Sequence, residues 1–555
     1  MTNASHHRRF LNLLIAFAAW GAFNCPVTAD EFPLAVRGKT AAQMKALVER
    51  AATENMIVSE IKVRASRSRQ LFECEFQKNT DNIPWLILLN ISETELQTQQ
   101  ADLLTKNYFP VIERSVTFQD KKLYTVVWQK KQEDRPLVIP AGPVPESGLK
   151  DERLNPFDEL MSTFIKQNNV AGATLAVAKN GRLVYARGFG YSDINKQEVM
   201  QPDSVMRIAS ISKPITAVAT LMLIEEGKLS LDTPVLPVLK TKSFQLSRTG
   251  DQRWADITVR HLLQHSGGWD RDISPDPMFQ IVNITRKEDL KRAARRKDIL
   301  RYQLSQPLDF APGERYAYSN FGYSVLAQVL EAVTDMPYED FIKQRVLTPC
   351  KMLKTQPGKT RLEDRLKNEV RYYPQTISTH TPFWSVPERA QRGAVPKIAA
   401  PVEAPYGQWD LEVMDAHGGW TSTAPDLLRF VAALDSRQQP LLNEASLITM
   451  AARPQLQDTT SGSSIWYGCG WNVRPIRPAE SALNQINIWH NGALAGTSTL
   501  LVRRSDGMSW AVLFNTDKAA SGERLATQID GPIHSAVNRV FSWPDHNLFE
   551  RKTLN

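Results

Sequence analysis

Apolar residues occupy almost every position from Ile215 to Leu223, and this pattern predicts a helix that is buried on all sides. Pro214 falls in its first turn, where a missing N–H costs little, and Gly227 is a typical C-cap after its last turn. The residues just before it, 207–209, read as a short extended segment. A strand-to-helix connection that ends in a core helix is therefore expected here.

Residues 32–131 show another pattern, in which a helical segment is followed by two alternating runs, and it recurs at an offset of 52 residues. Thr40-x-x-Gln43 and Ser92-x-x-Glu95 both read as capping boxes that open a helix. Each unit is thus predicted to be a helix followed by a hairpin, and two units can bury a shared core. No nucleophile with a base occurs here, so we expect a binding or spacer role.

A Pro- and Gly-rich linker is predicted at 132–152, and residues 153–545 read as one long domain with strands at both ends. This order favours an α+β sheet whose outer strands come from both ends of the domain. The segment 355–410 is irregular and is expected to form a cleft wall. Helices are predicted at 157–168, 258–263, 285–301, 323–333 and 525–541, and strands at 172–177, 183–190, 486–489, 499–502 and 510–513.

The composition is that of a soluble globular protein, with 42% hydrophobic and 23% charged residues. The net charge of +8 is modest for 555 residues and the basic residues are interspersed with acids, so no nucleic-acid partner is expected. A basic segment at 6–9 followed by an apolar run at 10–23 predicts a signal peptide over 1–29. We therefore expect an exported protein, periplasmic or secreted, without stable membrane insertion after signal cleavage.

Three cysteines remain after the signal, Cys74, Cys350 and Cys469, and their wide spacing predicts buried free thiols. His261 and His265 are four residues apart but have no evident third ligand. Neither a metal nor a cofactor is predicted.

Ser210 and Lys213 stand three residues apart at the start of the buried helix, so both side chains lie on one face. A serine hydroxyl becomes a nucleophile when a base takes its proton, and a lysine whose pKa is lowered by burial can do so. The same tetrad occurs at 59–62 and 147–150, but in a strand pattern and in the linker. The alternative is a polar helix cap beside a solvated lysine.

Tyr318 and Asn320 form the only Tyr-x-Asn of the chain and precede a predicted helix. A tyrosine hydroxyl beside a lysine ammonium can share or lose its proton and act as a base, and the Asn amide can donate to a substrate. The alternative is a tyrosine corner followed by an Asn helix cap.

His-x-Gly occurs at His265, His417 and His490. The first two continue into a double glycine, which indicates a turn. His490 instead follows the strand 486–489, where a strand beside the nucleophile can lend an N–H to an oxyanion and Gly492 can let substrate approach closely. His490 is therefore the predicted site residue.

The three motifs SISK, YSN and HNG, in this order and with flanks such as PGERYAYSNFGY and HNGALAGTSTLLV, resemble the serine β-lactamase and penicillin-binding protein superfamily, in its class C-like branch. The resemblance covers residues 155 to about 540. It implies an antiparallel sheet flanked by helices, with a helical lobe. The stretch DKKLYTVVWQKK resembles the bacterial tandem-repeat domain that accompanies some exported serine hydrolases.

The resemblance also implies roles for single residues. Ser210 would be the acylated nucleophile, Lys213 and Tyr318 the base pair, and Asn320 a substrate ligand. His490 and Gly492 would line the third wall, and the N–H groups of Ser210 and Ala493 would form the oxyanion hole.

This chain departs from dedicated β-lactamases and transpeptidases of the family at His490, where they usually carry a lysine that pairs with a substrate carboxylate. Histidine is largely neutral at pH 7, so the departure resembles the esterase and peptidase members instead. We expect a serine hydrolase that forms an acyl-enzyme from an ester or amide substrate. The alternatives are a D-amino-acid-specific peptidase or weak β-lactamase acting on wall peptides, and a non-catalytic binding protein on the same scaffold.

Overall fold

The computed structural model describes residues 32–554 apart from 67, 80–81, 242–243, 247–249, 386–400, 436–438, 458–462, 477–484 and 552. The predicted signal peptide lies outside these residues. The chain divides into two compact units, one from residues up to 133 with 378–402 and one from 134–377 with 403–555. No described helix is both long enough and apolar enough to cross a lipid bilayer.

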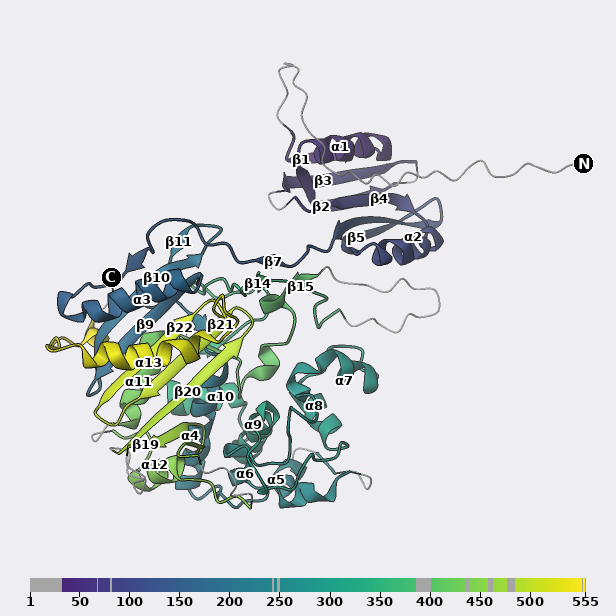
Figure 1. Cartoon of the computed structure of the whole chain (residues 1–555). Helices are drawn as coiled ribbons and strands as arrows, with labels where there is room; N and C mark the ends of the chain where they lie inside the picture. Colours follow the sequence, from purple (N-terminus) through teal and green to yellow (C-terminus); the bar gives the residue numbers. More distant parts are fainter. Residues whose placement is uncertain are drawn as a thin grey trace, which may run out of the picture. The chain divides into compact units, whose positions relative to one another are not determined.

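The first unit contains two successive β-α-β-β segments (Figure 1). Their strands form two three-stranded antiparallel sheets, with the orders β1-β3-β2 and β4-β6-β5. Both predicted capping boxes are present, Thr40 with Gln43 and Ser92 with Glu95. The elements are β1 (Ala35–Lys39), α1 (Ala41–Thr53), β2 (Met56–Ala65), β3 (Gln70–Lys78), β4 (Trp85–Ile91), α2 (Glu93–Thr105), β5 (Tyr108–Phe118) and β6 (Lys121–Lys130).

Each segment has a strand before its helix that the sequence pattern did not reveal. In β1 only Val36 is buried. In β4 one face is buried and the other is partly buried, so apolar residues occupy both faces and neither strand alternates apolar with polar residues in its sequence. The two segments bury neighbouring apolar clusters, one around Met44 and Phe72 and one around Leu96 and Trp128.

A nine-stranded antiparallel sheet forms the centre of the described part of the second unit. Its main path runs β11-β10-β9-β22-β21-β20-β19-β18, and β8 pairs with β10. As predicted, strands from both ends of the domain lie next to each other, because β9 pairs with β22. The strands are β8 (Glu146–Ser147), β9 (Gly172–Lys179), β10 (Arg182–Asp193), β11 (Glu198–Val199), β18 (Trp466–Tyr467), β19 (Asn472–Pro475), β20 (Ile486–Leu494), β21 (Thr497–Arg503) and β22 (Met508–Phe514).

Helices α3 (Asn155–Gln167) and α13 (Leu525–Asn538) pack on the central strands through one apolar cluster (Figure 1). Alternate residues of β9 and β22, including Val177 and Trp510, belong to this cluster. The residues between them, such as Ala176 and Ala511, are buried as well. The central strands are therefore covered on both faces, which explains their continuous apolar sequence. The predicted α+β architecture is confirmed.

The helical lobe lies beside the sheet (Figure 1). Its helices are α4 (Ser212–Glu225), α5 (Val235–Lys240), α6 (Val259–Leu263), α7 (Ile281–Lys287), α8 (Arg296–Gln303) and α9 (Asn320–Thr334). The prediction of one helix over 285–301 is wrong, because α7 ends at Lys287 and α8 begins at Arg296. Asp298 accepts from the backbone N–H of Arg295 and opens a new helix, which buries Ile299 and Leu300 while the charged residues between the helices stay largely exposed.

Short strand pairs tie the predicted linker and the irregular segment to the second unit. Within the linker, β7 (Arg135–Pro136) pairs with β14 (Thr376–Ile377), and β8 adds to the sheet. In the irregular segment, β13 (Gln356–Pro357) pairs with β17 (Trp420–Ser422). The predicted buried thiols are confirmed: Cys74, Cys350 and Cys469 are buried and free, and burial raises the pKa of each to about 12.

Candidate active site

Ser210 lies in the turn between a strand and the buried helix. Strand β12 (Met206–Arg207) pairs with β17, the residues Ala209–Ile211 form one 3-10 turn, and α4 begins at Ser212. Ala209 is in the left-handed region at φ 47°, although it is not glycine and is only 1% exposed. Backbone strain of this kind is maintained only where surrounding packing imposes it, and it occurs often at functional sites.

Lys213 is fully buried on the first turn of α4, and its Nζ has three oxygen partners. Nζ lies 3.1 Å from Oγ of Ser210, 2.7 Å from Oδ1 of Asn320 and 2.9 Å from the carbonyl oxygen of His417. Burial among apolar helix residues lowers the Lys213 pKa well below its ordinary value of 10.5, and the positive charge of Arg271 lowers it further. Only Asp276 acts in the other direction.

The hydrogen-bond partners of Lys213 determine in which direction the N–H bonds and the lone pair of a neutral amine point. An amide oxygen and a backbone carbonyl can only accept hydrogen bonds, so the two N–H bonds of a neutral amine point at Asn320 and His417. The lone pair then faces the hydroxyl of Ser210. The geometry thus suits transfer of the Ser210 proton to Lys213.

Tyr318 lies next to Lys213, and in the chain it directly precedes Ser319, the N-cap of α9. Nζ of Lys213 is 4.7 Å from the centroid of its ring. Burial raises the Tyr318 pKa above its ordinary value of 10, and a hydrogen bond with Ser210 opposes this only in part. The phenol is therefore protonated at neutral pH, and it is better suited to donate a proton than to remove one.

Asn320 holds two polar groups in position. Its Oδ1 accepts from Lys213, and its Nδ2 donates to Oδ2 of Asp276 at 2.7 Å. Asn320 lines the cavity at Ser210. These contacts fix the amine of Lys213, and the predicted contact of the Asn320 amide with a substrate stays a prediction.

His490 lies on β20 and is 1% exposed. Its Nδ1 is 2.7 Å from the carbonyl oxygen of Asn491, and its Nε2 is 3.0 Å from the hydroxyl of Tyr467. The first contact requires a proton on Nδ1, so Nε2 accepts from Tyr467. Burial, together with the charge of Lys213, lowers the His490 pKa to about 3. This position therefore carries no positive charge at pH 7.

Gly492 has a different neighbour from the one predicted. A Cβ at this position would lie 2.5 Å from the carbonyl oxygen of Ile208 and 3.0 Å from Cβ of Ala209. The glycine therefore lets β20 approach the Ser210 turn, rather than letting a substrate approach β20. Ala493, the predicted oxyanion donor, lines the same cavity as Ser210.

The other two His-x-Gly sequences also contribute to the site, which the sequence interpretation missed. The His417 carbonyl accepts from Lys213, and the ring of His265 packs 4.4 Å from the ring of Tyr318. Their double glycines did indicate turns, but a turn motif does not reveal which distant side chain it will contact. Asp276 and Arg271, in the irregular loop before α7, carried no motif at all.

The site opens into a cavity of about 630 Å³. Its walls come from the Ser210 turn, the loop 270–272, the segment 315–320, the loop 414–418 and β20. The Ser-x-x-Lys tetrads at 59–62 and 147–150 do not line it. Among the described residues no group of three or more His, Cys, Asp or Glu could hold a metal ion.

An antiparallel sheet beside a helical lobe, with a serine and a buried lysine in contact at a cavity, defines the class of β-lactamase-fold serine hydrolases. The family model described as Beta-lactamase matches residues 157–531, and the chain belongs to this family.

Two curated relatives match the chain at the same identity over different lengths. The chain is 27% identical over 408 residues to penicillin-binding protein 4* of Bacillus subtilis (strain 168), a match that covers 73% of this chain and 80% of the relative. It is 27% identical over 240 residues to protein flp of Staphylococcus aureus (strain N315), which covers 43% of this chain and 45% of the relative.

Solved structures share the fold at lower identity. EstCE1, a hydrolase with promiscuous acyltransferase activity, matches with a TM-score of 0.53 at 21% identity, over 70% of this chain and 98% of its own. A D-amino acid amidase from Ochrobactrum anthropi SV3 in complex with L-phenylalanine matches with a TM-score of 0.51 at 21% identity, over 70% of this chain and 99% of its own.

Proposed function

We propose that this protein is an exported serine hydrolase that acylates Ser210 with an ester or amide substrate. The observation that carries the proposal is the contact between Nζ of Lys213 and Oγ of Ser210, with burial lowering the Lys213 pKa and two acceptors orienting the amine. A protein that only binds ligands on this scaffold needs neither the buried lysine nor its contact with a serine.

In the acylation step, Oγ of Ser210 forms a bond to the substrate carbonyl carbon while its proton moves to Nζ of Lys213. The N–H groups of Ser210 and Ala493 stabilise the negative charge on the carbonyl oxygen. The bond to the leaving group then breaks, the Tyr318 hydroxyl gives its proton to the departing atom, and Lys213 returns a proton to Tyr318. Water attacks the acyl-enzyme through the same groups in reverse and releases the acid.

The neutral His490 favours an esterase-like or amidase-like substrate over a β-lactam. A lysine at this position would pair with the carboxylate of a β-lactam or peptide terminus, and a histidine with a pKa of about 3 cannot. The esterase-like reading agrees with the fold neighbour EstCE1. A D-amino-acid-specific peptidase or amidase is the second candidate, favoured by the fold neighbour that is a D-amino acid amidase.

The tandem-repeat-like unit would bind a partner or act as a spacer.

Labelling with a fluorophosphonate tests the proposal. We expect wild-type protein to be labelled, and Ser210→Ala to lose labelling and more than about 1,000-fold in ester hydrolysis, because the nucleophile is gone. Ser59→Ala is the matched control, since Ser59 heads the same tetrapeptide on an exposed strand position. Labelling that survives in Ser210→Ala, or is absent from wild type, would contradict the proposal. A persistent adduct with a fluorescent penicillin would favour the peptidase.

A further inference from the structure

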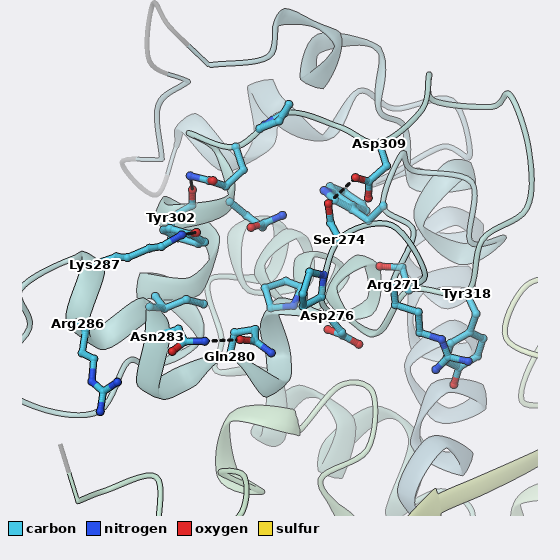
Figure 2. Close-up of a pocket in the computed structure, with 18 residues that line it drawn as sticks. Arg271, Ser274, Asp276, Gln280, Asn283, Arg286, Lys287, Tyr302, Asp309 and Tyr318 are labelled. Carbon is cyan, nitrogen blue, oxygen red and sulfur yellow. Dashed lines mark hydrogen bonds between the residues drawn. The ribbon is translucent and has the colours of Figure 1, made fainter.

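A second cavity, of about 560 Å³, lies in the helical lobe (Figure 2). The two cavities share Arg271 and Tyr318, which line both. Figure 2 shows the Arg271 side chain lying against the Tyr318 ring, and its Cζ is 5.0 Å from the ring centroid. Arg271 therefore belongs to the wall of the Ser210 cavity on the side of the helical lobe.

Arg271 carries an exposed charge that has no carboxylate partner among the described residues. Two acids flank it in sequence: Asp270 is already bound, since its Oδ2 accepts from Arg315 at 2.7 Å, and Asp272 forms no ion pair with Arg271 among the described residues. A guanidinium stacked on an aromatic ring is held in one orientation, with its N–H groups free at its edge. Such a group is suited to bind a carboxylate through two parallel hydrogen bonds.

The carboxylates of the second cavity also accept hydrogen bonds from neighbouring side chains. Asp309 accepts from the Ser274 hydroxyl at 2.6 Å, and Asp276 accepts from Asn320 at 2.7 Å. Arg286 and Lys287 line the same cavity, and Lys287 donates to the Tyr302 hydroxyl rather than to an acid. The three cations of this cavity, Arg271, Arg286 and Lys287, therefore outnumber its two carboxylates, Asp276 and Asp309, by one, and a bound anion would balance the remaining positive charge.

We propose that Arg271 binds an anionic group of the substrate, a carboxylate above all, in the part of the cavity next to the helical lobe. The inference rests on the proposed hydrolase function and adds to it the charge of the substrate. Arg271 is a specificity-determining residue in this scheme, because it contacts the substrate away from the bond that breaks.

The test compares matched esters with and without a carboxylate. In the first arm the acyl group carries or lacks the carboxylate, as in the p-nitrophenyl monoester of adipate compared with p-nitrophenyl hexanoate. In the second arm the leaving group carries or lacks the carboxylate, as in 4-acetoxybenzoate compared with its methyl ester. The measured quantity is the ratio of kcat/KM for the anionic and the neutral ester. This ratio cancels any effect of Arg271 on the Lys213 pKa, which acts on both esters alike.

We expect Arg271→Gln to lower this ratio about 10- to 100-fold in one of the two arms, as is typical for the loss of a charge-assisted hydrogen bond, and the affected arm identifies which side of the substrate Arg271 contacts. Arg271→Lys should keep part of the preference for the anionic ester, because the positive charge remains. Added salt should reduce the preference that is left. Arg524→Gln is the charge-matched control, because Arg524 lines the Ser210 cavity and likewise has no ion pair among the described residues.

A ratio that stays unchanged in Arg271→Gln in both arms, or that falls in Arg524→Gln instead, would overturn the inference. Failure of the hydrolase function itself would look different. In that case the neutral esters would be hydrolysed equally by wild type and Ser210→Ala.

Discussion

Lys213 shows how one residue depends on neighbours from several elements. Its helix removes it from water, Asn320 and the His417 carbonyl orient its amine, and Asp276 and Arg271 act on its pKa in opposite directions. Burial has the largest effect, so the pKa lies well below 10.5. At a given pH the neutral amine, which accepts a proton, is therefore a larger fraction of Lys213 than of an exposed lysine.

The pH dependence of hydrolysis should follow the ionisation of Lys213. Only the neutral amine accepts the Ser210 proton, so kcat/KM should rise with pH through the lowered Lys213 pKa. The Asp276 carboxylate favours the charged amine and raises that pKa, so Asp276→Asn should move the rising limb to lower pH. The measurement is kcat/KM for a neutral ester across the pH range.

Asp272→Asn serves as the control for this prediction, because Asp272 is an exposed acid of the same cavity that does not act on the Lys213 pKa. An unchanged rising limb in Asp276→Asn, or an equal shift in both variants, would show that Lys213 is not the group whose ionisation limits the rate.

At the scale of elements, the site depends on β20 lying against the Ser210 turn. The hydroxyl of Thr499, on the neighbouring strand β21, donates to the Ile208 carbonyl at 3.0 Å, and Gly492 leaves room for the turn beside β20. The sequence pattern placed this strand beside the nucleophile, but it did not predict the close packing of Gly492 on Ile208. It therefore assigned the glycine to the substrate instead of to the packing of one element on another.

Gly492→Ala should separate β20 from the turn. The added methyl would lie 2.4 Å from Oγ1 of Thr499 and 2.5 Å from the Ile208 carbonyl, so one of them must move. We expect a loss of about 1–3 kcal/mol of stability, as for other overpacked sites, and a fall of about 100-fold in kcat/KM if the shift approaches 1 Å. Thermal unfolding and ester hydrolysis measure the two effects.

Gly531→Ala is the control for stability, because a Cβ at Gly531 in α13 would meet no atom within 4 Å. Full activity and an unchanged Tm in Gly492→Ala would show that the strand does not constrain the turn.

At the scale of the whole molecule, the chain divides into two compact units with apolar clusters of their own. The clusters of the first unit contain no residue of the sheet that carries His490. The candidate active site uses residues of the second unit alone.

The two units should unfold separately in calorimetry of the intact chain. Met44→Ala should lower only one transition, since Met44 is fully buried in the first unit, and the loss of a core methionine costs about 2–5 kcal/mol. Met161→Ala, at an equally buried position under the central sheet, should lower only the other. The transition that responds to Met161→Ala should also be the one that shifts when Ser210 carries a covalent label. A single transition that moves in both variants would show that the units fold as one.

The sequence by itself determined the local features of this protein. Periodicity located the core helix, the hairpins and the late strands, because side-chain burial repeats at the period of the element. The spacing of Ser210 and Lys213 placed them in contact, since residues three apart on a helical turn face the same way. The motif order indicated the family.

Only the tertiary structure decided how distant residues act on one another. It gave Lys213 its acceptors, made His490 neutral by burial, turned Gly492 toward Ile208 and placed Arg271 between two cavities. Each of these depends on segments that are far apart in the chain. Charge state and packing are properties of a surrounding environment, and a linear pattern does not contain that environment.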